Sequence, residues 1–269
     1  MNDWFLVKEL DERTWVINDH GHSLIYLLAG RERALLIDTG WGVGDLSALV
    51  ESLTPLPLTV VNTHGHPDHC SGNAVFGRVH VNRADAFLVR RLRPPEMAWV
   101  KTNMFALRLP EGISLDTWQP DPGAFLDDLD DGRRFDLGGR TVEVIALPGH
   151  SPGSVCLLER PGGLLFSGDS ILHCVWVHLK ESVPLAAFHR HLLRLRERGR
   201  DVSGIFPGHG SFRRLPLPPT VLEELTLGIG RILSGELTGR PETNFAGQGL
   251  RCYFTSTGVI YPPVKSGER

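Results

Sequence analysis

Short apolar runs separated by turn-forming residues fill the first part of the chain. Runs of this kind, rich in Val, Ile, Leu and Thr, are typical of β-strands. The pattern predicts five early strands, which are Trp4–Leu10, Thr14–Ile17, Ser23–Leu28, Arg33–Ile37 and Thr59–Val61. We expect the first four to form a meander and the fifth to be buried. A helix over Asp45–Leu53 is expected before the fifth strand.

The second half of the chain repeats an arrangement of the first. In the first half, Leu35–Asp38 leads through a helix and a strand to His64, in a His-rich loop that ends at Gly72. In the second half, Leu164–Asp169 leads through a helix, Leu185–Arg198, and a strand, Gly204–Phe206, to His209. Both halves therefore place an acid and then a His at the C-terminal ends of strands, where layered α/β proteins carry their sites.

Further elements are expected on either side of this repeat. After the His-rich loop, the predicted elements are a helix Ser71–Phe76, a strand Val79–Asn82 and a helix Arg83–Leu92. Near the C-terminus they are a helix Thr220–Ser234 and a hairpin of Arg251–Ser256 and Val259–Tyr261. We expect residues 219–269 to extend the main domain, so that residues 1–269 form a single domain.

Residues 93–131 differ in composition from the rest of the chain. They carry Pro, Met, Trp and Phe without a clear period and end in the acidic run Asp127–Asp131. A long irregular segment of this kind is unusual inside a compact domain unless it covers a site. We predict a lid or insertion here, with packing against the domain surface or a dimer partner as the alternative.

Composition excludes several classes of partner. The chain has 269 residues and a formal net charge of −3, so no basic field exists to hold nucleic acid or an anionic membrane. The four cysteines show no paired spacing, which favours a reducing compartment. The start, MNDWFLVKEL, lacks the apolar core of a signal peptide. We therefore expect a cytoplasmic protein that acts on a small molecule, with a homodimer as an option.

The segment TVVNTHGHPDHCSG contains the closest grouping of potential metal ligands in the sequence. Four ligand-type side chains, His64, His66, Asp68 and His69, follow directly after a predicted buried strand. Imidazoles and a carboxylate crowded at the end of a strand are costly to desolvate unless a divalent metal binds their lone pairs. The loop therefore predicts a metal site.

The motif His-Gly-His-Pro-Asp-His resembles the His-x-His-x-Asp-His signature of the metallo-β-lactamase-fold hydrolases. The remaining ligand positions of that family are matched in order by His150 in LPGHSPGS, Asp169 in LLFSGDS and His209 in IFPGHG. The first family motif, an Asp at the end of a strand, is matched by Asp38. These matches extend over most of the chain.

The resemblance implies an αββα fold, with two mixed β-sheets packed as a sandwich and helices on both outer faces. It also implies that one metal takes His64, His66 and His150 and the other takes Asp68, His69 and His209. Asp169 would bridge the two metals, and Asp38 would hydrogen-bond the loop that carries His64 and His66.

The chemistry implied by the resemblance is hydrolysis by a hydroxide that two divalent metals share. Asp68 is the predicted catalytic acid–base residue, which holds the hydroxide and then relays a proton to the leaving group. Nitrogen-rich sites with carboxylates favour Zn²⁺, with Fe or Mn as alternatives.

Motif surroundings are most similar to the glyoxalase II (hydroxyacylglutathione hydrolase) branch, which favours an ester, thioester or lactone as the substrate. Three alternatives stay open. The first is a mononuclear-iron oxidoreductase of the persulfide-dioxygenase type. The second is a phosphodiesterase, nuclease or β-lactam hydrolase on the same scaffold, and the third is a non-catalytic scaffold or nucleic-acid-processing subunit.

The segment Gly149–Gly153 also matches the G-x-S-x-G motif of serine hydrolases. Pro152 follows the serine, however, and has no N–H to serve as the oxyanion donor that this motif needs. We therefore interpret Ser151 as a structural turn residue. Substrate-binding residues stay unassigned, and the weaker candidates for the pocket are His173, His178, Arg251 and Tyr253.

Overall fold

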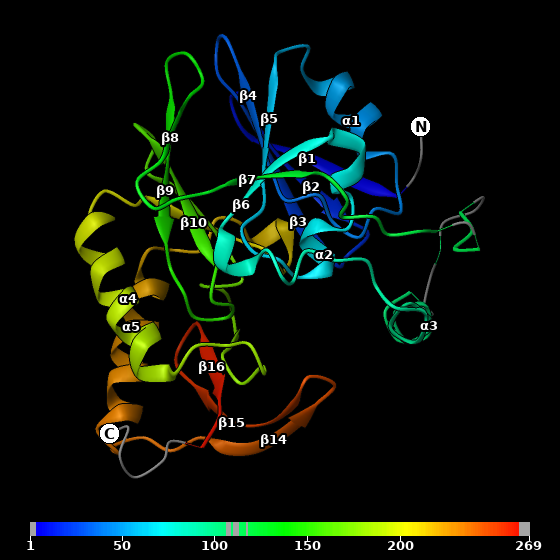
Figure 1. The fold of residues 1–269 in the computed structure, drawn as a ribbon. Helices are drawn as coiled ribbons and strands as arrows, with labels where there is room; N and C mark the ends of the chain where they lie inside the picture. Colours follow the sequence, from blue (N-terminus) through cyan, green and yellow to red (C-terminus); the bar gives the residue numbers. More distant parts are fainter. Residues whose placement is uncertain (1–3, 106–108, 110–112, 117, 264–269) are drawn as a thin grey trace. The chain divides into compact units, whose positions relative to one another are not determined.

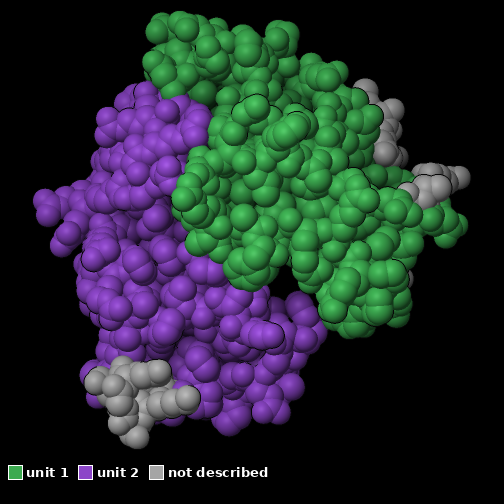
Figure 2. All heavy atoms as spheres, in the orientation of Figure 1, with its two compact units in different colours: residues 1–129, 136–139 green, residues 130–135, 140–269 purple. Residues whose placement is uncertain are grey.

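The structure is a computed structural model that describes residues 4–105, 109, 113–116 and 118–263. The chain folds into two compact units, which Figure 2 shows in different colours. Unit 1 comprises residues 1–129 and 136–139, and unit 2 comprises residues 130–135 and 140–269. The expectation that residues 1–269 form one domain stays a prediction.

Unit 1 contains a seven-stranded mixed sheet in the order β1 to β7 (Figure 1). Strands β1 to β4 are antiparallel neighbours, and β4 to β7 are parallel neighbours. The strands are β1 (Phe5–Asp11), β2 (Thr14–Asp19), β3 (Ser23–Ala29), β4 (Ala34–Ile37), β5 (Leu58–Val61), β6 (Arg78–Val81) and β7 (Phe125–Asp128). The predicted meander and buried fifth strand are confirmed, with ends that move by one or two residues.

Helix α1 (Leu46–Leu53) covers one face of this sheet. The carboxylate of Asp45 accepts a hydrogen bond from the Ala48 N–H and so caps the first turn. Leu46 and Val50 pack into an apolar cluster with side chains from β2 to β6. This burial fixes the helix where the sequence predicted it.

Two predicted helices after the His-rich loop are changed in the structure. The helix expected over Ser71–Phe76 is replaced by a single α-turn, α2 (Pro67–Cys70), and a 3-10 turn, η1 (Asn73–Phe76). Gly72 lies between the two, and glycine is required there because a Cβ would lie 2.5 Å from the carbonyl oxygen of Thr39.

The helix predicted over Arg83–Leu92 is wrong. Only a 3-10 turn, η2 (Arg83–Asp85), forms there. The Asp85 side chain is fully buried because its carboxylate accepts a hydrogen bond from the backbone N–H of Gly65. Phe87, in the middle of the predicted helix, is 60% exposed.

Segment 93–131 contains helix α3 (Pro94–Asn103) and strand β7. Of its described aromatic residues, Phe105 and Trp118 are buried in a cluster with Trp4 and Trp41, whereas Trp99 and Phe125 are exposed. The indole N–H of Trp118 donates to the backbone oxygen of Trp41 at 3.0 Å. The part of the segment around Phe105 and Trp118 therefore packs within unit 1. The lid role stays a prediction, and residues 106–108, 110–112 and 117 of the segment lie outside the described residues.

Unit 2 is built around a mixed five-stranded sheet in the order β13-β11-β10-β9-β8. Strands β9, β10 and β11 are antiparallel neighbours, whereas β11 and β13 run parallel. The strands are β8 (Arg134–Asp136), β9 (Thr141–Ala146), β10 (Val155–Arg160), β11 (Leu164–Gly168) and β13 (Gly204–Pro207).

Helices α4 (Leu185–Arg198) and α5 (Thr220–Leu233) lie side by side in unit 2 (Figure 1). The predicted stripe of α4 is buried against strands β10, β11 and β13 and against α5, and it consists of Leu185, Phe188, Leu192 and Leu195. The sequence predicted both ends of α4 because this apolar period is unbroken.

A smaller four-stranded sheet completes the described part of unit 2, in the order β12-β16-β15-β14. Its strands are β12 (Val175–Trp176), β14 (Arg240–Asn244), β15 (Gly247–Tyr253) and β16 (Gly258–Tyr261). The predicted C-terminal hairpin forms as β15 and β16, but its first strand covers Gly247–Tyr253 and not Arg251–Ser256. Strands β12 and β14 were not predicted, because a two-residue strand and a polar edge strand carry little periodic signal.

Candidate metal centre

The His-rich loop of unit 1 leaves the end of β5 and enters α2. The backbone N–H of Asn62 still bonds to His80 in the neighbouring strand β6 at 2.8 Å. The next anchor is Asp85, whose carboxylate accepts the Gly65 N–H at 2.9 Å. These two bonds hold the loop on both sides of His64, one to strand β6 and one to η2. They therefore fix the path of the backbone that carries His64.

Asp38 holds the loop from the end of β4. Its carboxylate accepts hydrogen bonds from the backbone N–H and the hydroxyl of Thr63, at 2.7 and 2.8 Å. The same carboxylate lies 2.9 Å from Nδ1 of His69. Asp38 has a φ of 66°, a left-handed conformation in which Asp is one of the better tolerated side chains. The predicted bond to the loop is present, and the bond to His69 is an additional one.

A second set of polar side chains supports the backbone of His69. Its carbonyl oxygen accepts hydrogen bonds from the backbone N–H of Thr39, at 2.8 Å, and from the side-chain amide of Asn62, at 3.0 Å. The amide of Asn73 in turn donates to the Asn62 side chain at 2.8 Å. These residues are buried, so the network is held away from water.

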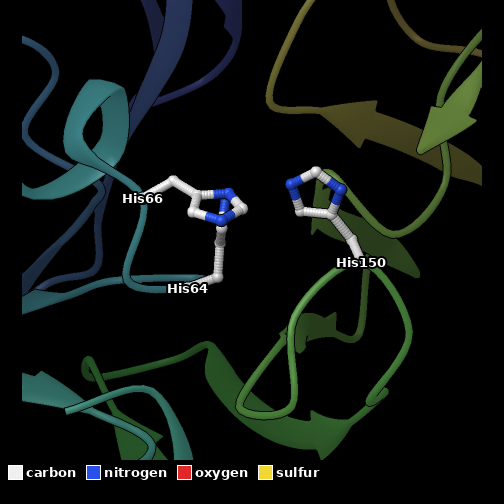
Figure 3. A group of neighbouring side chains, drawn as sticks. All are labelled: His64, His66 and His150. Carbon is white, nitrogen blue, oxygen red and sulfur yellow. The ribbon is translucent and has the colours of Figure 1, made fainter. Parts of the chain in front are cut away.

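The four predicted ligands of unit 1 lie together on this loop. The ring centroids of His64 and His66 are 4.7 Å apart, and those of His64 and His69 are 4.2 Å apart. Nε2 of His69 lies 3.6 Å from a carboxylate oxygen of Asp68. Figure 3 shows the rings of His64 and His66 projecting from the loop between β5 and α2.

In unit 2, Asp169 and His209 come together because their strands are parallel neighbours. Asp169 follows β11 and His209 follows β13, and the backbone N–H of Gly208 donates to the carbonyl of Gly168 at 2.7 Å. This bond brings Nε2 of His209 to 3.2 Å from the Asp169 carboxylate.

His150 lies on the loop between β9 and β10, also in unit 2 (Figure 3). Its Nε2 is 3.5 Å from the Asp169 carboxylate, and its Nδ1 is 2.8 Å from the backbone oxygen of Trp176. The loop approaches helix α4 so closely that a Cβ on Gly149 would lie 2.3 Å from the Phe188 ring. Glycine is therefore required beside His150.

These two groups of side chains fit a divalent metal. In His64, His69 and His150, Nδ1 lies within hydrogen-bond distance of a protein oxygen, which orients Nε2 as the ligand atom. The Nε2-to-carboxylate separations are 3.2 to 3.6 Å. Two ligand atoms about 2.1 Å from a tetrahedral zinc lie about 3.4 Å apart. The donor set and its spacing therefore match metal coordination in each unit separately.

Burial raises the pKa values of two groups near the loop of unit 1. Burial, with the carboxylates of Asp68, Asp38 and Asp85 as secondary causes, raises the pKa of the Cys70 thiol well above its usual value. Cys70 is therefore a thiol at neutral pH, which excludes it as a thiolate nucleophile. Burial also raises the pKa of Asp19 to about 6, although hydrogen bonds from Trp41 and Trp4 oppose the shift.

Other predicted residues take structural positions. Ser151 is buried, and its hydroxyl lies 2.7 Å from that of Ser154, as expected of a turn residue. His173 is exposed, with Nδ1 3.4 Å from the backbone oxygen of Ser256. The supporting residues Asp85, Asn62 and Asn73 were missed, because no motif or period in the sequence marks them.

Known proteins resemble the chain in sequence and in fold. The family model of the metallo-beta-lactamase superfamily matches residues 18–216. The acyl-coenzyme A thioesterase MBLAC2 of Homo sapiens is 28% identical over 242 residues, which cover 77% of this chain and 81% of that protein. The atrochrysone carboxyl ACP thioesterase of Aspergillus fumigatus is 26% identical over 205 residues, which cover 75% of this chain and 40% of that protein.

Among solved structures, a metallo-beta-lactamase from Pontibacter korlensis superposes with a TM-score of 0.60 at 19% sequence identity. The match covers 84% of this chain and 99% of that chain. The predicted fold class is confirmed by this likeness. In the described part of the chain, no helix combines the length and the apolar character needed to cross a membrane.

Proposed function

Because the chain belongs to the metallo-beta-lactamase superfamily, we propose that it is a metal-dependent hydrolase of small-molecule thioesters. The observation that carries the proposal is the set of imidazole and carboxylate side chains, in which His64, His69 and His150 are oriented through Nδ1. The chain is also similar to proteins named as thioesterases. The glyoxalase II branch suggested by the motif surroundings stays a prediction.

The proposal assigns two divalent metals to seven side chains. One metal would be held by His64, His66 and His150. The other would be held by Asp68, His69 and His209, and Asp169 would be a ligand to both. Metals at these positions would supply an activated water and a Lewis acid for the thioester carbonyl. We favour Zn²⁺ for this nitrogen-rich set, with Fe or Mn as alternatives.

The protein residues orient ligands and move a proton in this proposal. Asp38 and the backbone oxygen of Trp176 each fix the tautomer and ring orientation of one His, through Nδ1 of His69 and of His150. Asp68, whose carboxylate lies next to His69, accepts the proton of the attacking water and delivers it to the leaving sulfur. A thiol with a pKa near 8.5 is a good leaving group, so proton delivery assists thioester cleavage less than it would assist amide cleavage.

Elemental analysis of the purified protein, combined with a substrate panel, tests the proposal. The panel contains an acyl-pantetheine thioester, a lactone, a phosphodiester and a β-lactam, each with and without chelator. We expect about two divalent metals per chain and chelator-sensitive thioester cleavage. Full thioester cleavage in the metal-free protein would contradict the proposal. One iron per chain together with persulfide oxidation would instead indicate the oxidoreductase alternative.

Two further expectations go with this proposal. The substrate is a small molecule, with no nucleic acid or membrane partner, and the homodimer stays an option that gel filtration with light scattering decides. The cytoplasmic location also stays a prediction, and fractionation of cells that produce the protein would test it.

A further inference from the structure

An exposed aromatic ring in unit 2 is linked to His150 through one residue. The backbone oxygen of Trp176 lies 2.8 Å from Nδ1 of His150. The Trp176 ring packs against the Phe245 ring, with centroids 5.2 Å apart. The neighbourhood of a candidate metal ligand thus continues directly into an aromatic pair.

Phe245 lies at the tip of the hairpin formed by β14 and β15. Asn244 pairs with Gly247 in the sheet register, so Phe245 and Ala246 form the two-residue turn. Such turns favour Gly, Asn and Asp, yet here a Phe side chain stands 66% exposed. Neither the turn geometry nor a buried core accounts for an aromatic residue at this position.

The hairpin tip is fixed in place rather than loose. Asn244 Oδ1 accepts a hydrogen bond from the Ala246 N–H at 2.9 Å and lies 3.2 Å from Nε2 of His178. The His178 ring in turn packs edge-on against Trp176, with centroids 5.6 Å apart. The position of Phe245 relative to Trp176 is therefore set through Asn244, the residue before the turn.

We propose that Trp176 and Phe245 form a subsite for the apolar acyl group of the substrate. The inference rests on the thioesterase function proposed above and adds the substrate class, a medium- or long-chain acyl thioester. Aromatic faces bind alkyl chains by removing apolar surface from water, whereas the pantetheine part of such a substrate is rich in amides. An acyl chain would cover the exposed Phe245 ring and the half-buried Trp176 ring, and Trp176 adjoins His150, where the proposal places the thioester carbonyl.

Direct binding to the metal-free protein tests the subsite without any catalysis. The probes are S-dodecyl-pantetheine and S-methyl-pantetheine, which are thioethers that cannot be hydrolysed, and binding is measured by calorimetry. Contact with one face of a phenyl ring is worth about tenfold in affinity. We expect Phe245→Ala to weaken S-dodecyl-pantetheine binding about tenfold and to reduce the preference over S-methyl-pantetheine by a similar factor.

Two further variants control this measurement. Phe245→Leu keeps an apolar side chain at the tip and should recover most of the lost affinity. Phe125→Ala removes a Phe that is 77% exposed on β7 of unit 1 and should leave binding of both probes unchanged. Circular dichroism of each variant confirms that the fold is retained.

The outcomes separate this inference from the proposed function. Equal affinity of the wild type and Phe245→Ala for S-dodecyl-pantetheine would overturn the subsite, even if thioesters are cleaved. A chain-length-dependent loss of binding would support it, even if the thioester panel fails. Conversion of a dimer to a monomer by Phe245→Ala, with probe binding unchanged, would show that the ring is a subunit contact and overturn the inference.

Discussion

Nδ1 of His69 lies 2.9 Å from the carboxylate of Asp38, thirty-one positions earlier in the chain. The bond connects the end of β4 to α2. It orients the ring of His69, a predicted metal ligand, through Nδ1 and so leaves Nε2 as the ligand atom. Both side chains are buried, so the interaction is shielded from solvent. The same carboxylate holds Thr63, so one residue fixes both ends of the His-rich loop.

The first prediction is that Asp38→Asn weakens metal binding about 10- to 100-fold, because the charged acceptor that orients His69 is lost. Asn tolerates the left-handed backbone of position 38, so the change isolates the side-chain effect. Competition with a chromophoric chelator measures the affinity. Asp136→Asn changes an exposed Asp of unit 1 and serves as the control. An Asp38→Asn protein that binds metal as tightly as the wild type would disprove the orienting role.

The second prediction concerns the close packing around Gly65. A Cβ at this position would lie 2.7 Å from the Leu88 Cβ and 2.8 Å from the backbone oxygen of Asp85. Gly65→Ala should therefore lower the free energy of unfolding by about 1–3 kcal/mol and reduce metal affinity, because the loop must shift. Urea denaturation and chelator competition measure the two effects.

Gly230→Ala is the matched control for this substitution. Position 230 lies in helix α5, and the nearest atoms to a Cβ there belong to the His189 side chain, at 3.3 Å. Alanine has the higher helix propensity, so this variant should be as stable as the wild type or slightly more stable. If Gly65→Ala behaved like Gly230→Ala, the close packing would not constrain the loop.

The sequence predicted those parts of the molecule that depend on short-range periodicity or on known motifs. Helix α4 was predicted with both ends correct because its apolar stripe is continuous and covers the five-stranded sheet. The residues named as ligands could be found because His, Asp and Gly recur at characteristic spacings. In each unit separately, the structure brings those residues together.

The parts that sequence reasoning missed depend on long-range side-chain bonds. Asp85 falls within a helix that was predicted and does not form, and its buried carboxylate accepts a hydrogen bond from the N–H of Gly65, twenty positions earlier. Asn62 and Asn73 support the backbone of His69 through amide groups whose partners are distant in the chain. Pairs of residues that are distant in the chain produce no periodic pattern in the sequence, so they can be recognised only in the folded structure.

The third prediction is that Asp169→Ala lowers metal stoichiometry and thioester hydrolysis together. This carboxylate lies 3.5 Å from Nε2 of His150 and 3.2 Å from Nε2 of His209, so its removal deletes the acid that both rings face. Elemental analysis and a thiol-release assay measure the two quantities. Asp130→Ala removes an exposed carboxylate of unit 2 and should change neither. Full activity with full metal content in Asp169→Ala would refute the bridging role.

The fourth prediction is a pH dependence of stability caused by Asp19. Burial raises the pKa of this carboxyl from 3.8 to about 6 in the folded state. Between about pH 4 and pH 6 the folded protein therefore holds a proton that the unfolded chain has released, and stability falls as the pH rises. The stabilisation is fully present below pH 3.8 and is lost as the pH rises through about 6.

A difference of about two pKa units corresponds to about 3 kcal/mol of unfolding free energy. Urea denaturation of metal-free protein, repeated from about pH 4 to about pH 8, should show this fall in the wild type but not in Asp19→Asn. The carboxyls of Asp121, Asp128 and Glu143, whose pKa values are lowered, change stability in the opposite direction in both proteins. Only the difference between the two curves therefore reports on Asp19. Parallel curves would show that the carboxyl ionises at its ordinary pKa, so that burial beside Trp4 and Trp41 does not raise it.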